Sequence, residues 1–353
     1  MSSDTVADGA TTPARPRGPR GGRSVPTIYD VAKLAGVNPS TVSRALSQPG
    51  RINVKTEARV HAAAKELNYR LNPIARALPT GRTSTLALLL ADITNPMIFG
   101  IVRGAEHTAS QHGYTLVIAE SQESGEREAT TAERVQPSVD GLILGTTRLS
   151  DEQIQRLAES KPLVLINREV EGVSSILPDV SPGIDEALAH LQSLGHTSVA
   201  YLSGPATSWM SAARWGSLLE QAVARGMSVV EIGPGAPTLD GGRSALARVI
   251  AAGVTAVFAY NDLMAIGLLR AAIEQGIEVP GRISIVGFDD IFGSDFTTPA
   301  LTTIRTPLAL AGERAVRLEL QMVETGSDEV VVDQEEPIIT ELVVRGSTGR
   351  SAR

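Results

Sequence analysis

With 353 residues, the chain is long enough for two or three domains of ordinary size. Hydrophobic residues make up 42% of it and charged residues 20%, a globular balance that excludes a wholly disordered or fibrous chain. The absence of cysteine excludes disulfide bonds, thiolate metal ligands and a cysteine nucleophile. We therefore expect packed domains that do not depend on disulfide bonds or thiolate-bound metal.

Metal binding and membrane insertion are also not expected. The 5 histidines never take the spacing of two ligands on one helix, so we predict no metal and no other cofactor. No apolar run approaches the roughly 20 residues that cross a bilayer, and the N-terminus lacks the apolar core of a signal peptide. The expectation is a cytoplasmic protein without a membrane partner.

The net charge of −7 is distributed unevenly along the chain. Residues 1–82 carry 13 Lys and Arg against 5 Asp and Glu, whereas the remainder carries 19 against 34. A basic N-terminal region in front of an acidic body predicts a polyanionic partner for that region alone. Residues 1–26 combine prolines, glycines and arginines with almost nothing apolar, and we expect them to form a disordered basic arm.

Residues 27–70 have the pattern of a helix-turn-helix domain. Thr27 and Asp30 form a capping box in front of a first helix, and Gly36 ends that helix. Asn38 can cap a second helix with Pro39 at its first position, and Asn53 can cap a third. Apolar residues recur at the spacing of one buried helix face: Ile28, Val31, Ala32, Ala35, Val42, Ala45, Leu46, Val60, Ala63, Ala64 and Leu67.

The second helix turns short hydroxyl side chains and one arginine away from the predicted core. Arg44 can donate two hydrogen bonds to guanine in the major groove, while Ser40 and Thr41 suit phosphate or mixed contacts. We predict that this is a recognition helix; the alternative is a structural helical hairpin with an exposed polar face. The candidate DNA contacts in this domain are Thr27, Tyr29, Asn38, Pro39, Ser40, Thr41, Ser43, Arg44 and Asn53.

Residues 71–82 are predicted to form a short hinge helix and a linker. Asn72 and Pro73 can start a helix, but Pro79 and Gly81 stop it within two turns, below the roughly 12 residues that hold an isolated helix together in water. We expect this segment to be helical only against DNA or a partner subunit. Leu78 is either a wedge that kinks DNA from the minor groove or a linker residue packed on the next domain. The candidate DNA contacts here are Asn72, Ala75, Arg76 and Leu78.

From Thr85 onward, short apolar runs alternate with amphipathic stretches of helix length, which predicts parallel β-sheets with helical crossovers. The runs fit two α/β lobes better than one sheet: 86–90, 116–118, 141–144, 163–166, 199–202, 254–258 and 283–286. Ligands of such folds bind beyond the carboxyl ends of the strands. The polar residues at these ends are Asp92, Asn95, Arg168, Asn261, Asp262, Asp289 and Asp290, and helix capping is the alternative role for each.

Motifs of catalysis are missing from the sequence. It contains no nucleophile elbow and no phosphate-binding Gly-Lys-Ser/Thr loop, and Gly233-Pro234-Gly235 lacks the third glycine of a dinucleotide-binding turn. Asp289 and Asp290 could act as an acid/base pair only if both faced one cleft, but neighbours on a strand point apart. We therefore expect binding rather than catalysis, with a sugar-modifying enzyme as the less favoured alternative.

These residues together resemble the lactose-repressor/galactose-repressor family of bacterial transcriptional regulators, over residues 27–347. The most specific part of the resemblance is residues 27–37, with the sequence TIYDVAKLAGV, followed by residues 40–46, with the sequence STVSRAL. Shorter matching pieces follow: Asn95-Pro96, Val139-Asp140-Gly141, Leu194-Gly195-His196, Ala259-Tyr260-Asn261-Asp262, Gly287-Phe288-Asp289-Asp290 and Pro299-Ala300-Leu301-Thr302-Thr303-Ile304.

The resemblance implies a fold and a function. It implies an all-α headpiece and an α/β effector domain, residues 83–347, with two lobes like those of periplasmic sugar-binding proteins, joined by three crossings of the chain and followed by a tail at 348–353. It further implies a homodimer that reads a near-palindromic operator, a hinge helix ending at Leu78, and a small polar effector, with a sugar favoured. We expect a regulator, with repression favoured; a small-molecule binding protein without a regulatory role is the alternative.

The resemblance also implies an effector site between the two lobes. Arg214, Asn261 and Asp289 match ligand-contacting positions of the family, and residues 92–98 match a second wall. Trp209 and Trp215 lie on either side of Arg214 in the sequence, and one of them could stack on a sugar face; packing in the core is the alternative. The effector candidates are Asp92, Asn95, Ile98, Arg168, Trp209, Arg214, Asn261 and Asp289.

The sequence departs from the family at Leu71, where proline is common, at Pro79, where a basic residue is usual, and at Ser217, where glycine is usual. No heptad repeat closes the chain, so we expect no tetramer held by a terminal coiled coil.

Overall fold

The computed structural model describes residues 26–47, 50–69, 81–326 and 335–352, which belong to two compact units divided after Arg76. The predicted basic arm up to residue 25 and most of the predicted hinge, including Asn72, Ala75, Arg76 and Leu78, lie outside these ranges. No helix among the described residues is both long and apolar enough to span a membrane. Within the same ranges, no group of three or more acidic or histidine side chains is arranged to hold a metal ion.

The first unit is a bundle of three short helices: α1 (Ile28–Ala35), α2 (Pro39–Ser47) and α3 (Val54–Glu66). The Asp30 carboxylate accepts hydrogen bonds of 2.7 Å from both the backbone nitrogen and the hydroxyl group of Thr27, which caps α1 as predicted. Gly36 ends α1 with a φ of 62°, a left-handed conformation that favours glycine. The expected apolar residues form one core, which contains Val31, Val42 and Val60 at 0% exposure.

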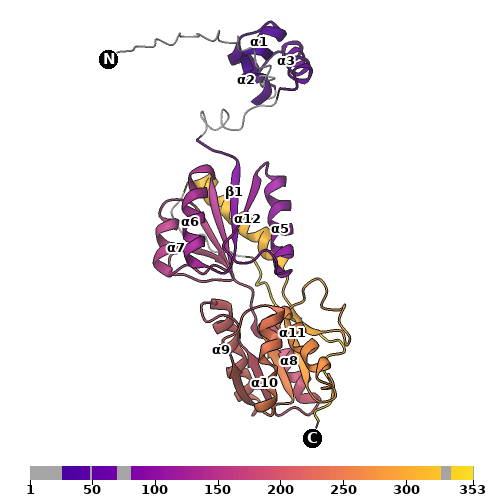
Figure 1. The fold of residues 1–353 in the computed structure, drawn as a ribbon. Helices are drawn as coiled ribbons and strands as arrows, with labels where there is room; N and C mark the ends of the chain where they lie inside the picture. The colour runs from indigo at the N-terminus through magenta and orange to yellow at the C-terminus, as the bar shows by residue number, and fades with distance from the viewer. Residues whose placement is uncertain (1–25, 48–49, 70–80, 327–334, 353) are drawn as a thin grey trace, which may run out of the picture. The chain divides into compact units, whose positions relative to one another are not determined.

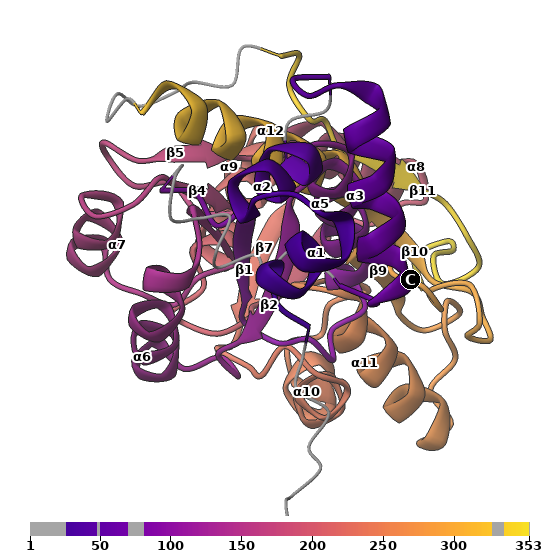
Figure 2. The same cartoon turned by 90° about the horizontal axis from the view of Figure 1, so that it is seen from above.

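The first lobe of the second unit is built on a parallel sheet with the strand order β2-β1-β3-β4-β5. Helices α6 and α7 lie on one side of this sheet and α5 on the other (Figure 2). Successive side chains of β1 point to opposite sides of the sheet. Leu86, Leu88 and Leu90 pack with α5 and α12, while Ala87 and Leu89 pack with α6 and α7. The strands are β1 (Thr85–Leu90), β2 (Thr115–Glu120), β3 (Gly141–Gly145), β4 (Leu163–Ile166) and β5 (Ser174–Ile176); the helices are α5 (Met97–Gln111), α6 (Gly125–Val135), α7 (Asp151–Ala158) and α12 (Leu308–Thr325), with a short 3-10 turn at Gln136–Ser138.

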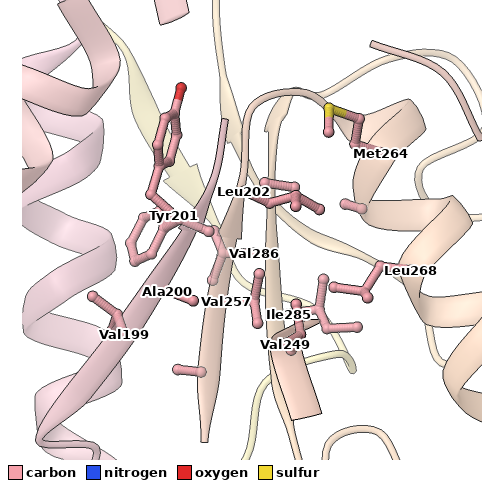
Figure 3. Close-up of a cluster of buried hydrophobic side chains, with 14 of the residues drawn as sticks. Val199, Ala200, Tyr201, Leu202, Val249, Val257, Met264, Leu268, Ile285 and Val286 are labelled. Atoms are coloured by element: carbon pink, nitrogen blue, oxygen red, sulfur yellow. The ribbon is translucent and has the colours of Figure 1, made fainter. Parts of the chain in front are cut away.

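The second lobe contains a six-stranded sheet with the order β11-β10-β9-β8-β6-β7, parallel except for β11. Leu202, Met264 and Leu268 gather on the side of this sheet covered by α11, while Val199 and Tyr201 lie on the opposite side (Figure 3). The strands are β6 (Ser198–Leu202), β7 (Ser228–Ile232), β8 (Ala256–Ala259), β9 (Ser284–Asp289), β10 (Thr302–Arg305) and β11 (Glu341–Val343); the helices are α8 (Ser181–Ser193), α9 (Trp209–Ala224), α10 (Leu239–Ala251) and α11 (Asp262–Glu274).

The chain passes between the lobes three times: between β5 and α8, between β10 and α12, and between α12 and β11. Helix α12 comes late in the chain yet packs beside α5 in the first lobe (Figure 1). Gly104 on α5 and Gly312 on α12 allow the two helices to approach closely, because neither has a side chain. A Cβ atom at either position would collide with the backbone of the other helix. The predicted two-lobed α/β architecture is therefore confirmed.

Four strands, β5, β7, β10 and β11, are absent from the predicted apolar runs. β5, β10 and β11 have only three or four residues each, and the five residues of β7 include Ser228 and Glu231, so none of the four forms an apolar run that stands out in the sequence. The C-terminal segment expected as a tail packs on the second lobe instead. The buried imidazole of His196 bonds the carbonyl oxygen of Gly349 at 3.0 Å, and the amide of Ser351 donates to the carbonyl oxygen of Leu194 at 2.9 Å. These bonds satisfy polar groups that would otherwise be buried without partners.

Candidate DNA-binding surface and effector cleft

The outward face of α2 is polar and accessible. Ser40, Ser43 and Arg44 are exposed, whereas Thr41 is half-buried and Val42 and Ala45 form the inner face of the helix. Among the described residues, Arg44 forms no ion pair, so its guanidinium group can meet a base or a phosphate. The prediction of an exposed arginine among short hydroxyl side chains on one helix face is confirmed.

The other candidates in this unit have mixed roles. Tyr29 is 71% exposed and Thr27 and Asn38 are also exposed, which leaves their side chains accessible to a ligand, while Pro39 is half-buried. The Asn53 side chain accepts a hydrogen bond of 2.9 Å from the backbone nitrogen of Lys55 and so acts as the N-cap of α3. DNA contact by these residues stays a prediction, because an N-cap and a DNA contact are compatible roles for an exposed side chain.

In the second unit, Arg214 on α9 and Asp289 at the end of β9 meet directly. The Arg214 Nη2 atom lies 2.7 Å from Asp289 Oδ1, and the two side chains are 5% and 1% exposed. Arg214 also donates to the carbonyl oxygen of Tyr260 and lies over the ring of Phe288, 3.7 Å from its centroid. Burial raises the pKa of the Asp289 carboxyl above its ordinary value, and the adjacent guanidinium opposes this rise.

Two atoms of this ion pair have no partner in the described structure. Asp289 Oδ2 and Arg214 Nε are buried and make no hydrogen bond, which leaves one acceptor and one donor unsatisfied. Most buried polar atoms in folded proteins are hydrogen-bonded, so an unsatisfied pair at the carboxyl end of a parallel sheet points to a ligand that completes it. Phe288 and Tyr260, which orient the arginine, were not predicted as site residues, although each directly precedes one that was.

A cavity of about 600 Å³ adjoins Asp289 and reaches from the second lobe to the first. Pro96 and Met97 line it from the start of α5, and Thr306 lines it from the crossing after β10. The hydroxyl oxygen of Thr306 is buried and has no hydrogen-bond partner among the described residues. The sequence does not identify Thr306 as a site residue, because it follows β10, a strand that the apolar pattern did not predict. A single threonine outside a predicted strand end carries no signal of a binding role.

Several predicted effector residues bond to residues near them in the sequence, as a helix cap or as a support of a turn. Asn261 accepts from the Met264 backbone nitrogen at 2.9 Å and donates to the Pro237 carbonyl oxygen at 3.0 Å, so it caps α11. The Asp92 carboxylate accepts two bonds from Thr94, and Asn95 accepts a bond of 3.2 Å from the Met97 backbone nitrogen. These side chains therefore stabilise the start of α11 and the turn before α5, and direct contact with an effector stays a prediction for each.

The remaining candidates already form an ion pair or pack against a hydrophobic core. Arg168 forms an ion pair of 2.5 Å with Asp151, although its buried Nε atom has no partner among the described residues. Trp209, the first residue of α9, is half-buried against the core of the second lobe, and Ile98 is 4% exposed in the core of the first. Trp215 stacks on Tyr201 with ring centroids 5.7 Å apart, so the core-packing alternative holds for this second tryptophan.

The acidic neighbours Asp289 and Asp290 face different partners. Asp290 pairs with Arg345 at 2.6 Å and with Arg305 at 2.8 Å, whereas Asp289 pairs with Arg214. Asp289 and Asp290 also have φ angles of 102° and 51°, uncommon values for residues other than glycine that concentrate at ligand sites. The two carboxylates therefore do not share one reacting centre. This agrees with the expectation that these neighbouring side chains point apart.

Comparison with known proteins identifies the family of the chain. Residues 27–72 match the model of "Bacterial regulatory proteins, lacI family", and residues 188–348 match that of a "Periplasmic binding protein-like domain". The transcriptional regulator GalS of Salmonella typhimurium is 34% identical over 303 residues, which cover 84% of this chain and 89% of GalS. The chain therefore belongs to the LacI family of bacterial regulatory proteins.

Solved structures support this membership over nearly the whole chain. The lac repressor dimer bound to operator and the anti-inducer ONPF has a TM-score of 0.82 and 27% identity, covering 92% of this LacI-family chain and 100% of that one. The transcriptional regulator CelR in complex with cellobiose has a TM-score of 0.67 and 29% identity, covering 91% and 99%. Membership in a family of regulatory proteins confirms the expectation of a regulator rather than an enzyme.

Proposed function

We propose that this protein is an effector-responsive transcriptional repressor that acts in the cytoplasm. It binds a near-palindromic operator as a homodimer, and the cleft of its second unit binds a small sugar that changes operator affinity. GalS is named as a transcriptional regulator, the lac repressor was solved as a dimer on operator DNA, and CelR was solved with cellobiose. A symmetric dimer requires two equivalent half-sites, which is why the operator is expected to be near-palindromic.

DNA recognition is assigned to α2. Its exposed face presents Arg44 between hydroxyl side chains, which suits bidentate bonding to guanine together with contacts to phosphates. The first unit and the segments next to it carry the basic part of the sequence, which supplies the charge for phosphate contacts. Operator affinity should then fall with salt by about 0.9 log units per log unit of salt for each phosphate neutralised.

Effector binding is assigned to the Arg214–Asp289 pair, and the observation that carries this assignment is its unsatisfied donor and acceptor. A sugar hydroxyl group both donates and accepts, so one hydroxyl can bond Asp289 Oδ2 while a neighbouring one accepts from Arg214 Nε. The aromatic rings of Phe288 and Tyr260 hold the guanidinium group in place for this contact. The guanidinium group is thus held in place before the sugar arrives, which limits the entropy lost on binding.

Two experiments test the proposal. Selection from random duplexes with purified full-length protein should enrich a symmetric sequence, and enrichment of no symmetric sequence would contradict operator binding. A thermal-shift screen with ribose, galactose, cellobiose and other neutral sugars should raise the unfolding temperature for at least one, because a ligand at 100 times its dissociation constant adds about 2.7 kcal/mol of stability. A hit that Arg214→Met and Asp289→Asn abolish would support this pocket, whereas a hit that persists in both variants would contradict it.

A further inference from the structure

Residues 82–85, near the start of the second unit, are fixed to the first lobe by several polar contacts. We call them the lead-in segment, because they begin at the last residue of the predicted hinge and linker and lead into β1. Residues of β2, β3 and α12 or their immediate neighbours bond to it, and all of these contacts lie within the second unit. The backbone nitrogen of Thr115, for example, donates to the carbonyl oxygen of Ser84 at 2.9 Å.

Asp140, the residue just before β3, is the centre of these contacts. Its Oδ1 atom accepts from the backbone nitrogen of Thr83 at 2.6 Å and from the Thr83 hydroxyl group at 2.8 Å, and its Oδ2 atom accepts from the backbone nitrogen of Ser84 at 2.9 Å. Its own backbone nitrogen donates to the Thr85 carbonyl oxygen at 2.8 Å. Asp140 is only 8% exposed, so these bonds are largely shielded from water.

The backbone conformation of Ser84 indicates that the lead-in segment is held in one defined conformation. Its φ of 52° lies in the left-handed region, which is unfavourable for a residue with a Cβ atom. The bonds from Asp140 and Thr115 hold Ser84 in this conformation. If they were removed, the segment would relax and the direction in which the chain leaves the lobe would no longer be fixed.

Arg82 joins the lead-in segment to the last turn of α12. Its Nη2 atom donates to the carbonyl oxygen of Val323 at 2.9 Å, where a cation also interacts favourably with the negative end of the helix dipole. The opposite end of α12 follows Thr306 and Pro307, which form the crossing from the second lobe and line the cavity next to Asp289. With 18 residues, α12 spans about 27 Å between these two places.

β1 makes a second connection of the same kind. It starts at Thr85, in the lead-in segment, and ends at Leu90, from which a short turn leads to Pro96 and Met97 at the cavity next to Asp289. A packed helix and a buried strand therefore both run from the cleft to the lead-in segment. Rigid elements of this sort can pass a movement at one end to the other end.

We propose that Asp140 and Arg82 are positioning residues that couple sugar binding in the cleft to the hinge. When the sugar moves the first lobe, including α12 and β1, relative to the second lobe, Arg82 and Asp140 carry the lead-in segment with it, which changes the geometry of the hinge and the operator affinity of the protein. The inference rests on the proposed function, because it requires both an operator and a sugar. It assigns to these two side chains a role separate from contact with either ligand.

The test measures operator affinity with and without a sugar in the full-length protein. The probe is whichever of ribose, galactose and cellobiose gives the largest thermal shift, used with the selected operator. Asp140→Asn and Arg82→Ala should reduce the ratio of the two operator affinities at least fivefold, while the sugar dissociation constant changes less than twofold. Glu186→Gln is the matched control, since its carboxylate accepts a backbone bond of 2.7 Å from Leu342 in the second lobe, away from this path.

The outcomes separate coupling from stability. A purely structural role would lower the unfolding temperature and leave the affinity ratio at the wild-type value, and that result would overturn the proposal. If Asp140→Asn does not fold, Thr83→Val removes only the hydroxyl donor and should still reduce the ratio, and an unchanged ratio in this variant would equally overturn it. If the wild-type protein itself shows no specific operator or no sugar response, the proposed function fails rather than the coupling.

Discussion

The Arg214–Asp289 pair allows a quantitative test, because both side chains are buried in the second lobe. The perturbation is Asp289→Asn, which keeps the shape of the side chain and tolerates the positive φ of 102° at this position. The change leaves the Arg214 guanidinium buried without its counter-charge. Loss of one partner of a buried ion pair typically costs about 3 to 5 kcal/mol, which corresponds to a change of roughly a hundredfold or more in the unfolding equilibrium constant.

The assay is urea unfolding followed by tryptophan fluorescence. Both tryptophans of the chain, Trp209 and Trp215, lie on α9 with Arg214, so the signal reports on this lobe. Asp185→Asn is the control, because Asp185 pairs with Arg225 at the surface with a side chain that is 58% exposed. Such exposed pairs contribute about 0 to 1 kcal/mol.

A double variant refines the test. Arg214→Met combined with Asp289→Asn removes the unpaired charge, so it should be less destabilised than the sum of the two single variants. If Asp289→Asn is no more destabilising than Asp185→Asn, or if the two single effects simply add, then the pair is not energetically coupled and its assignment as a preformed site loses its physical basis.

Three further predictions concern other parts of the molecule. Arg44→Ala should weaken binding to the selected operator by about 1 to 3 kcal/mol while changing binding to random DNA much less, and gel-shift titrations giving equal losses on both would contradict base reading. Leu78→Ala should reduce operator bending in a phasing assay without changing the free energy of unfolding; unchanged bending would favour the linker interpretation of Leu78. Burial raises the pKa of the Glu319 carboxyl well above its ordinary value of 4.5, so the folded state retains a proton that the unfolded state loses, and this residue makes stability fall as pH rises above about 4.5. Glu319→Gln should therefore be more stable than wild type at pH 8, with a difference that grows by up to about 1.4 kcal/mol per pH unit and disappears near pH 4; a difference that does not depend on pH would refute the assignment of a buried, protonated carboxyl.

The Glu319 side chain also shows where sequence reasoning reaches its limit. A glutamate in an amphipathic helix is normally assigned to the solvent face, yet in α12 it is fully buried, and a Cβ atom at Gly141 would occupy the position of its carboxylate. Asp262 is similar, because burial raises its pKa to about 7 while it accepts bonds from Ser294, Thr303 and the backbone nitrogen of Ile291. Neither burial is visible in the sequence, since both depend on segments that are distant along the chain.

Local patterns were enough to determine the helical unit and most strands of the lobes. Capping by Thr27 and Asp30, termination at Gly36 and the apolar spacing of α1 to α3 are set by neighbouring residues, so they can be read directly from the sequence. The alternating faces of β1 follow from its own pleat in the same way. Polar residues at strand ends were also found correctly, because the carboxyl edge of a parallel sheet follows from the order of strands and helices.

Only the tertiary structure decided what these polar residues do. Asn261, Asp92 and Asn95 bond the backbone near them as caps or turn supports, while Arg214 and Asp289, which are 75 residues apart in the chain, meet and leave one donor and one acceptor without a partner. Asp140 likewise looks like any residue before a strand until Thr83 and Ser84 are seen on its carboxylate. The physical reason is that a hydrogen bond or ion pair between distant residues depends on where the folded chain brings them, whereas caps, turns and apolar periodicity depend on residues within about one helical turn.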